Sequence, residues 1–297
     1  MRSPRDIRAA WKARPSSYSA PVWTLILALD ALPWPWGEEL LAGGFVARAF
    51  VRTSRWRRAL AWAGAHAATP GQRWTLARAL CAHHGRFVAR SALVGLRDGE
   101  SLRRHLSVLG AEHLAAAGPG AILLGFHLGP AQSYLALRVA GHRLTWIGAL
   151  GASGAWPRAI VARFQDGHDD LLLPGAPHAW ARRLYRARQL LREGRHVFIS
   201  ADGTGAEAFT VPVRGGVVSI GAGAVFLRRT TGAAVLPVLS HMEGRTQVVT
   251  IHPALPPRLA DAALDRQACR DALAALLGEH VRRFPEHCYA LAFGLPE

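Results

Sequence analysis

The stretch GPGAILLGFHLGP, at Gly118–Pro130, decides the fold that the sequence predicts. Its apolar run, Ala121–Phe126, lies between a Gly-Pro-Gly turn and His127. A short apolar run between turn-forming residues is typical of a strand that is buried on both faces, as in a parallel sheet. The stretch therefore predicts a central strand that ends at a histidine.

On both sides of this run, apolar runs of strand length alternate with stretches of helical periodicity. The predicted strands are Ala121–Phe126, Leu144–Leu150, His196–Ala201, Ala233–Leu239 and Gln247–His252. The predicted helices are Leu102–Ala117, Ser133–Ala140, Ala179–Glu193, Ile220–Thr231 and Ala262–Phe284. This alternation predicts an α/β fold with a mainly parallel sheet flanked by helices.

The composition indicates a folded chain that attracts anions. Half of the 297 residues are hydrophobic and only 19% are charged, which excludes a disordered chain. The net charge of +16 favours nucleic acid, anionic lipid or an acidic carrier protein as partner, but no nucleic-acid-binding module is recognisable. Three cysteines without paired spacing indicate neither a disulfide framework nor a zinc module.

Residues 1–60 differ from the rest of the chain in how basic, apolar and aromatic residues are distributed. The basic segment Met1–Ser17 precedes the apolar segment Ala20–Leu29, which ends well short of the roughly 20 residues that span a bilayer. We expect neither a clean transmembrane helix nor a signal peptide. Tryptophans and arginines then mix, as suits a lipid headgroup layer: Trp23, Trp34, Trp36, Trp56, Arg48, Arg52, Arg55, Arg57 and Arg58. The sequence predicts a helical membrane-interface section at 1–60 and an α/β domain at 61–297, the alternative being a helical subdomain with tryptophans in its core.

Polar residues follow two of the predicted strands directly. His127 follows the first, and Asp202-Gly203 follows the strand at 196–201. Ligands of open α/β sheets bind at the carboxyl ends of strands, and a histidine there can accept a proton near pH 7. The alternative is a histidine that only caps the strand or fills a buried hydrogen-bonding position.

A third candidate site precedes the predicted helix at 220–231. Ser219 is placed as its N-cap, and Arg214 lies in the preceding loop. Backbone N–H groups at a helix start, next to an arginine, can hold a phosphate or carboxylate. An ordinary capped helix packed on the sheet explains the same residues.

In order along the chain, four motifs resemble those of the late acyltransferases of lipid A biosynthesis, the lauroyl and myristoyl transferases of the lysophospholipid acyltransferase superfamily. They are GPGAILLGFHLG at 118–129, VFISADG at 197–203, VPVRGG at 211–216 with the following AVFLRRTTGAAVLPV at 224–238, and VRRFPEHCY at 281–289. The resemblance covers roughly residues 30–292. Each motif alone is weakly specific, whereas four in this order are more specific.

The resemblance implies transfer of a fatty acyl group from a carrier thioester to a hydroxyl of a membrane glycolipid. The donor would be an acyl carrier protein or coenzyme A thioester, with no cofactor and no metal. Acyl carrier protein and anionic lipid would be the partners, at the cytoplasmic face of the bacterial inner membrane, peripheral or N-terminally anchored. His127 would be the general base, and the residues implied to bind substrates are Gly129, Asp202, Gly203, Arg214 and Ser219.

The resembled motif is a histidine, four residues, and then Asp or Glu, whose carboxylate fixes the tautomer of the ring. Gln132 stands at the position of that acidic residue. A glutamine orients an imidazole but stabilises its cation much less than a carboxylate does. Three explanations stay open: Gln132 suffices for a slower reaction, another carboxylate such as Asp202 or Asp166 reaches the ring, or the chain is a catalytically impaired lipid-binding homologue.

Two further readings compete. Gly151-Ala-Ser153-Gly-Ala155 nearly matches the nucleophile elbow of an α/β-hydrolase, with Ser153 as nucleophile. Metal sites at His168-Asp169-Asp170 with Asp166, and at His83-His84, are more simply explained as polar segments.

Arginines on the helix at 179–193 could contact an acidic carrier protein, although a solvated helix face explains them too.

Overall fold

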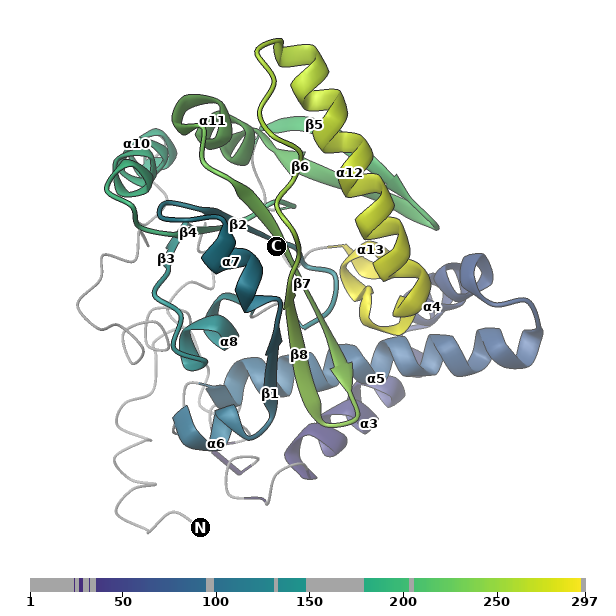
Figure 1. Ribbon diagram of the computed structural model, residues 1–297. Helices are drawn as coiled ribbons and strands as arrows, with labels where there is room; N and C mark the ends of the chain where they lie inside the picture. The colour runs from purple at the N-terminus through teal and green to yellow at the C-terminus, as the bar shows by residue number, and fades with distance from the viewer. Residues whose placement is uncertain are drawn as a thin grey trace.

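The computed structural model describes residues 36–94, 99–130, 133–147, 179–202 and 206–294, together with Thr24, Leu27, Ala28 and Leu32. Within these ranges the chain forms an α/β fold around a six-stranded sheet of order β1-β8-β7-β2-β4-β3 (Figure 1). The strands are β1 (Leu106–Leu109), β2 (Ile122–Gly125), β3 (Thr145–Ile147), β4 (Val197–Ser200), β7 (Val235–Glu243) and β8 (Thr246–Ile251). The predicted central strand is therefore β2, in the interior of the sheet.

The sheet is mainly parallel, as predicted. β2 pairs parallel with both β4 and β7, β3 with β4, and β1 with β8. Only β7 and β8 pair antiparallel, because the short turn at Gly244-Arg245 joins them as a hairpin. The prediction of an α/β fold with a mainly parallel sheet flanked by helices is confirmed.

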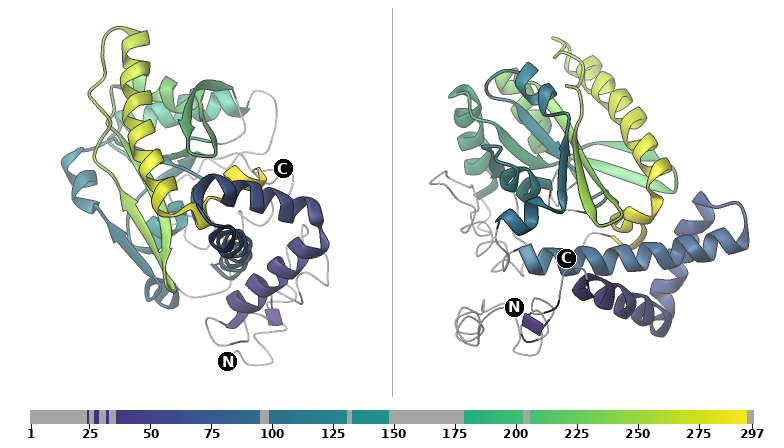
Figure 2. Two further views of the ribbon diagram at one scale, coloured as in Figure 1. Left: turned by 90° about the vertical axis from the view of Figure 1, so that its right-hand side faces the viewer. Right: turned by 60° about the horizontal axis from the view of Figure 1, so that its bottom comes forward.

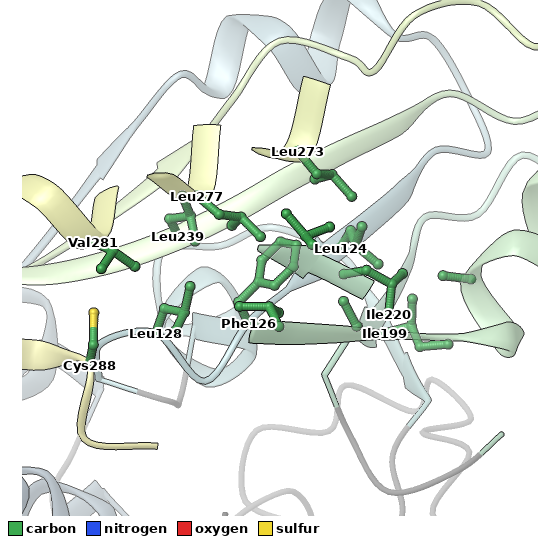
Figure 3. Close-up of a cluster of buried hydrophobic side chains, with 14 of the residues drawn as sticks. Leu124, Phe126, Leu128, Ile199, Ile220, Leu239, Leu273, Leu277, Val281 and Cys288 are labelled. Atoms are coloured by element: carbon green, nitrogen blue, oxygen red, sulfur yellow. The ribbon is translucent and has the colours of Figure 1, made fainter. Parts of the chain in front are cut away.

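Helices cover both faces of the sheet, because side chains of a strand alternate between the faces. Ile122 and Leu124 of β2 belong to the core under α10, α11 and α12, whereas Leu123 belongs to the core under α7 and α8. In Figure 3, Leu273 and Leu277 of α12 lie against the cluster that contains Leu124. The bounds are α7 (Ala111–Ala116), α8 (Ser133–Val139), α10 (Ala179–Arg192), α11 (Ala222–Thr231) and α12 (Ala262–Arg283).

Helices from the N-terminal part form a separate layer. They are α3 (Trp36–Val51), α4 (Thr53–His66) and α5 (Pro70–Val94), whereas the short α6 (Gly99–Arg103) contacts α8 and β1 of the sheet domain. α5 crosses below the sheet, and α3 packs along the side of α5 that faces away from the sheet (Figure 2). α4 includes residue 60, the position at which the sequence predicts the chain to divide. No helix of the described residues is both long and apolar enough to cross a bilayer.

The C-terminal segment ties this layer to the sheet domain. After α12 the chain forms the 3-10 helix η1 (Pro285–His287) and α13 (Tyr289–Phe293), which pack on α5 and α4. The Trp62 indole N–H of α4 donates to the Pro285 carbonyl oxygen at 2.9 Å. The N-terminal helices α4 and α5 therefore contact the last segments of the described chain, η1 and α13.

Two predicted helices are wrong in part. The stretch predicted as one helix at Leu102–Ala117 contains α6, β1 and α7, because Gly110 turns the chain at φ +74° and four residues before it pair with β8. The helix predicted from Ile220 begins at Ala222. Ile220 belongs instead to a two-stranded antiparallel hairpin, β5 (Glu207–Val213) and β6 (Gly216–Gly221), whose buried Val211 and Val218 follow a period of two.

Candidate active site

His127 and Asp202 meet because their strands are neighbours in the sheet. β2 and β4 are parallel and in register, with Gly125 opposite Ser200. Each side chain of interest follows its strand by two residues, so the same register brings both to the carboxyl edge of the sheet. This edge is where open α/β sheets bind their ligands.

Asp202 holds His127 at two points. Its Oδ2 accepts a hydrogen bond from the His127 backbone N–H at 2.7 Å, and its Oδ1 lies 2.8 Å from the His127 Nδ1. A carboxylate can only accept, so Nδ1 carries the proton and Nε2 is the lone-pair nitrogen of the neutral ring. The His127 side chain is 29% exposed, and no described residue hydrogen-bonds its Nε2. The ring is therefore oriented as a base and accessible to a substrate.

Asp202 also changes the proton affinity of this ring. Burial disfavours the charged imidazole, but the negative charge of Asp202 and the hydrogen bond to it outweigh the burial and raise the pKa of His127. Of the three explanations left open by Gln132, the geometry favours the second, in which a carboxylate elsewhere in the chain reaches the ring. That carboxylate is Asp202, whereas Gln132 and Asp166 lie outside the described residues.

The loop after His127 is fixed against β7. Gly129 adopts φ +110°, and a Cβ there would lie 1.8 Å from the Ser240 carbonyl oxygen. Ser240 Oγ donates to the Pro130 carbonyl oxygen at 2.6 Å, and Ser133 Oγ donates to Ser240 Oγ at 3.2 Å. Only glycine allows this close approach, so Gly129 has a structural role in presenting His127.

Tyr289 closes the inner side of the site. Its side chain is fully buried, and burial together with the nearby charge of Asp202 raises the pKa of its hydroxyl well above the ordinary value. Tyr289 opens α13, so the C-terminal segment that resembles the family's closing motif packs beside the dyad. The sequence motif does not reveal this proximity, because 87 positions separate Tyr289 from Asp202 and only the packing of α13 brings them near each other.

The third site predicted from sequence is wrong in its geometry. Ser219 lies exposed in β6, the N-cap of α11 is Gly221, and no side chain caps that helix. Arg214 lies at the turn of the β5–β6 hairpin, where its Nε donates to the Ala65 carbonyl oxygen of α4. Six strand residues, roughly 20 Å of extended chain, separate that turn from the start of α11. A hairpin strand with alternating burial, and not a loop, therefore precedes the helix.

The start of α11 nevertheless lies beside the dyad. The Gly221 N–H donates to the Ala201 carbonyl oxygen at 2.7 Å, directly before Asp202. Several predicted residues lie outside the described ranges: Gln132, Gly203, Ser153 and the cluster at 166–170. The structure thus unites His127 with Asp202 and places Arg214 at the other end of the β6 strand, away from both.

A narrow cavity adjoins the loop that follows His127, and a larger cleft adjoins that cavity. A narrow cavity of about 10 Å³, room for about one water molecule, lies between Gly129 and Pro130 on one side and Phe87 and Tyr289 on the other. It shares His83, Arg86, Met242 and His287 with a polar cleft of about 380 Å³. The narrow cavity is too small for a hydrocarbon chain, and the cleft is lined largely by charged side chains, so neither forms an acyl tunnel.

No family model and no curated protein matches this chain. The functional proposal therefore depends on the dyad and its surroundings, together with the order of motifs in the sequence.

Proposed function

We propose that this chain is an O-acyltransferase that moves a fatty acyl group from a carrier thioester to a hydroxyl of a membrane glycolipid, with His127 as general base. The observation that carries the proposal is the 2.8 Å contact between His127 Nδ1 and Asp202 Oδ1, on a ring that is 29% exposed. A carboxylate that fixes the tautomer and stabilises the imidazolium is what a general base for an alcohol requires.

The surroundings of the dyad favour direct transfer over a covalent acyl-enzyme. The two serine hydroxyls near the loop, Ser133 and Ser240, donate to Ser240 and to the Pro130 carbonyl oxygen. Among the described residues no serine or cysteine hydrogen-bonds to the His127 ring. The group that the base activates is therefore the hydroxyl of the acceptor itself.

The reaction then follows in two proton transfers. His127 Nε2 takes the proton of the acceptor hydroxyl while its oxygen attacks the thioester carbonyl carbon, and Asp202 stabilises the resulting imidazolium. The tetrahedral oxyanion collapses, the C–S bond breaks, and the imidazolium returns its proton to the leaving thiolate. Thioester and alcohol thus yield ester and thiol, with the neutral ring restored.

Asp202 also bears on the alternative that the chain is a catalytically impaired homologue. That reading rests on the missing charge at Gln132, and Asp202 supplies a carboxylate to the same ring. A hydrolase that uses the same base differs only in the acceptor, which would be water. The experiment below separates these outcomes.

The surface of the N-terminal layer supports a lipid acceptor. Phe50 stacks on Trp56 at 4.3 Å, and Trp56 meets Trp74 edge-on at 4.8 Å, at the junction of α3 and α4. Val51 beside them is 84% exposed, and Phe50 and Trp74 are 42% and 48% exposed. Exposed arginines flank them: Arg48, Arg52, Arg57 and Arg58. Aromatic rings among cations suit the headgroup layer of an anionic membrane, and we propose that the chain binds the cytoplasmic face of the bacterial inner membrane there.

A second basic surface fits an acidic carrier protein. α10 places Arg182 and Arg192 in solvent together with Tyr185, which is 58% exposed. Positive charge of this kind steers an acidic partner to the surface and strengthens its binding at low salt. We propose this face of α10 as the docking site for acyl carrier protein.

The test combines purified protein, lauroyl and myristoyl acyl carrier protein, and vesicles of a bacterial inner-membrane lipid extract. Thiol release and the mass of the product lipid are followed together. We expect both in the wild type, and a loss of about 10²- to 10⁴-fold in His127→Ala. His113→Ala, a change of a partly exposed histidine on α7, serves as the matched control and leaves the rate unchanged.

Each other outcome has a meaning. Thiol release that does not depend on the vesicles and gives no acylated lipid indicates a hydrolase. Equal rates in wild type and His127→Ala contradict the proposed base, and no turnover in the wild type with any bacterial lipid contradicts the acyltransferase.

A further inference from the structure

Three side chains with metal-binding atoms meet behind the loop that carries His127. His83 comes from α5, and Glu286 and His287 come from η1, about 200 positions later in the chain. One imidazole nitrogen from each histidine and one carboxylate oxygen all lie within 4.8 Å of one another. The packing of η1 on α5 creates this juxtaposition, which spacing in the sequence does not reveal.

His287 has unused hydrogen-bonding capacity in a buried position. It is only 3% exposed, and neither of its ring nitrogens has a hydrogen-bond partner among the described residues. An unpaired buried polar group costs about 1–3 kcal/mol, and such groups are rare in folded proteins. The His83 ring lies edge-on to the His287 ring, with centroids 4.2 Å apart, so the two imidazoles face the same small volume.

We propose that His83, Glu286 and His287 bind one divalent transition-metal ion of the zinc type. Two imidazole nitrogens and one carboxylate oxygen form a donor set that Zn²⁺ prefers, and three protein ligands leave the fourth tetrahedral position open. The open position faces the polar cleft of about 380 Å³, because all three side chains line it. The cleft also gives the ion a path from solvent.

The separation of the ligand atoms is close to what such an ion requires. Metal–ligand bonds of about 2.0–2.2 Å place tetrahedral donors about 3.3–3.5 Å apart. The ligand atoms must therefore approach by about 1.5 Å at most from their 4.8 Å limit. Rotation of the side chains, of which Glu286 is half-buried at the wall of the cleft, is the movement that the site requires.

The charges around the cluster leave room for a cation. Arg86 is paired with Glu39 at 2.9 Å, and Arg90 is paired with the buried Glu38 at 2.8 Å. Within the described part of the chain, no ion pair engages Glu286. Each of the two arginines thus has its own carboxylate partner, and no ion pair among the described residues competes for the Glu286 carboxylate.

The test measures Zn²⁺ binding directly, without an activity assay. Full-length protein is stripped with a chelator, dialysed, and titrated with Zn²⁺ alone against a chromophoric chelator, and the visible spectrum with Co²⁺ reports the geometry. We expect one equivalent in the wild type with a tetrahedral Co²⁺ spectrum. His83→Gln, Glu286→Gln and His287→Gln should each weaken that equivalent by more than about 100-fold, since even outer-shell changes cost 10–100-fold.

Two variants serve as controls. His84→Gln changes the neighbouring half-buried histidine of α5, which stacks on Tyr289 instead of facing the cluster. His127→Gln removes the proposed base. Both should bind Zn²⁺ as the wild type does, so that metal binding and acyl transfer are judged separately.

A buried histidine variant can fail to fold, so circular dichroism accompanies every titration. Glu286→Gln changes a side chain at the wall of the cleft and stays decisive if His287→Gln unfolds. A wild type that binds no Zn²⁺ at micromolar concentration overturns the proposal. So does a folded Glu286→Gln or His83→Gln that keeps the equivalent, because the ion then binds elsewhere.

Discussion

One carboxylate, that of Asp202, accepts hydrogen bonds from both the backbone N–H and the imidazole of His127, 75 positions away in the sequence, at 2.7 and 2.8 Å. The two bonds fix the position and the tautomer of the ring at once. Such an arrangement serves catalysis only if the charge of the carboxylate matters as well as its shape, and this can be tested.

Asp202→Asn keeps the shape of the side chain and removes its charge. We expect turnover to fall by up to about 10⁴-fold, because the amide can hold the ring in the wrong tautomer and stabilises the imidazolium poorly. The measurement is the initial rate of acyl transfer at saturating donor, with circular dichroism as a check of folding. A variant that retains full turnover would assign the polarising role to another group.

The pH dependence follows from the direction of the His127 shift. Asp202 raises the pKa of His127, and only the neutral ring accepts a proton. The rate should therefore rise as the pH increases through this raised pKa and level off above it. In Asp202→Asn the midpoint should move to lower pH, since the raising charge is gone. Profiles of kcat/KM against pH for both proteins test this, and coincident midpoints would contradict it.

Gly129→Ala should disturb the loop that presents His127. The new Cβ would lie 1.8 Å from the Ser240 carbonyl oxygen, at a φ of +110°. We expect a stability loss of about 1–3 kcal/mol from the backbone conformation, plus the displacement of the loop, and a strong loss of activity. Gly141→Ala is the matched control, because Gly141 has φ +99° with nothing within 4 Å of a Cβ. Urea unfolding and turnover are measured for both variants. Equal losses of stability and activity in Gly129→Ala and Gly141→Ala would show that the contact with Ser240 is unimportant.

Asp265→Ala should destabilise the fold strongly. Asp265 accepts two hydrogen bonds from Arg228, at 2.7 and 3.3 Å, and both side chains are 5% exposed or less. Removing one partner of a buried pair leaves the other charge uncompensated, which costs about 3–5 kcal/mol. The exposed pair of Glu279 and Arg282 is the control, and Glu279→Ala should leave the urea midpoint unchanged.

The same pair predicts a dependence of stability on pH. The hydrogen bonds from Arg228 lower the pKa of Asp265 against the opposing effect of burial. The stabilisation is therefore complete above the pKa of the unfolded chain, near 4, and is lost as the pH falls through the lower pKa of the fold. Unfolding free energies of wild type and Asp265→Ala should converge in acid.

The proposed membrane contact predicts a localised effect. Val51→Asp places a charge among the exposed rings of Phe50 and Trp74 and should weaken binding to anionic vesicles about tenfold or more. Leu264→Asp changes a residue that is 62% exposed on α12, and this variant should bind the vesicles as the wild type does. Vesicle sedimentation at low and high salt measures both, and in the wild type salt should release only part of the protein. Complete release by salt alone would contradict an apolar contribution.

Local sequence patterns were sufficient to predict the strands β2 and β4 and the helices α10 and α12. The apolar runs at 121–126 and 196–201 are short and bounded by turn residues, so their strands and the polar residues after them could be predicted. The strand in the region at 102–117 could not be predicted, because four residues of β1 acquire strand conformation only by pairing with β8, 141 positions later. The hairpin at 207–221 is not predictable from its short alternation alone, because its Val211 and Val218 become buried only when the two strands pair and pack on the core.

The sequence by itself determined that His127 and Asp202 each end a buried strand, because runs of apolar residues between turns dictate where strands stop. Only the tertiary structure decided that these strands are neighbours in register, that Arg214 lies away from them, and that His83 meets His287. Those facts depend on which strand pairs with which and on how a 3-10 helix packs against α5. Pairing and packing are set by the burial of the whole core, and no local segment carries that information.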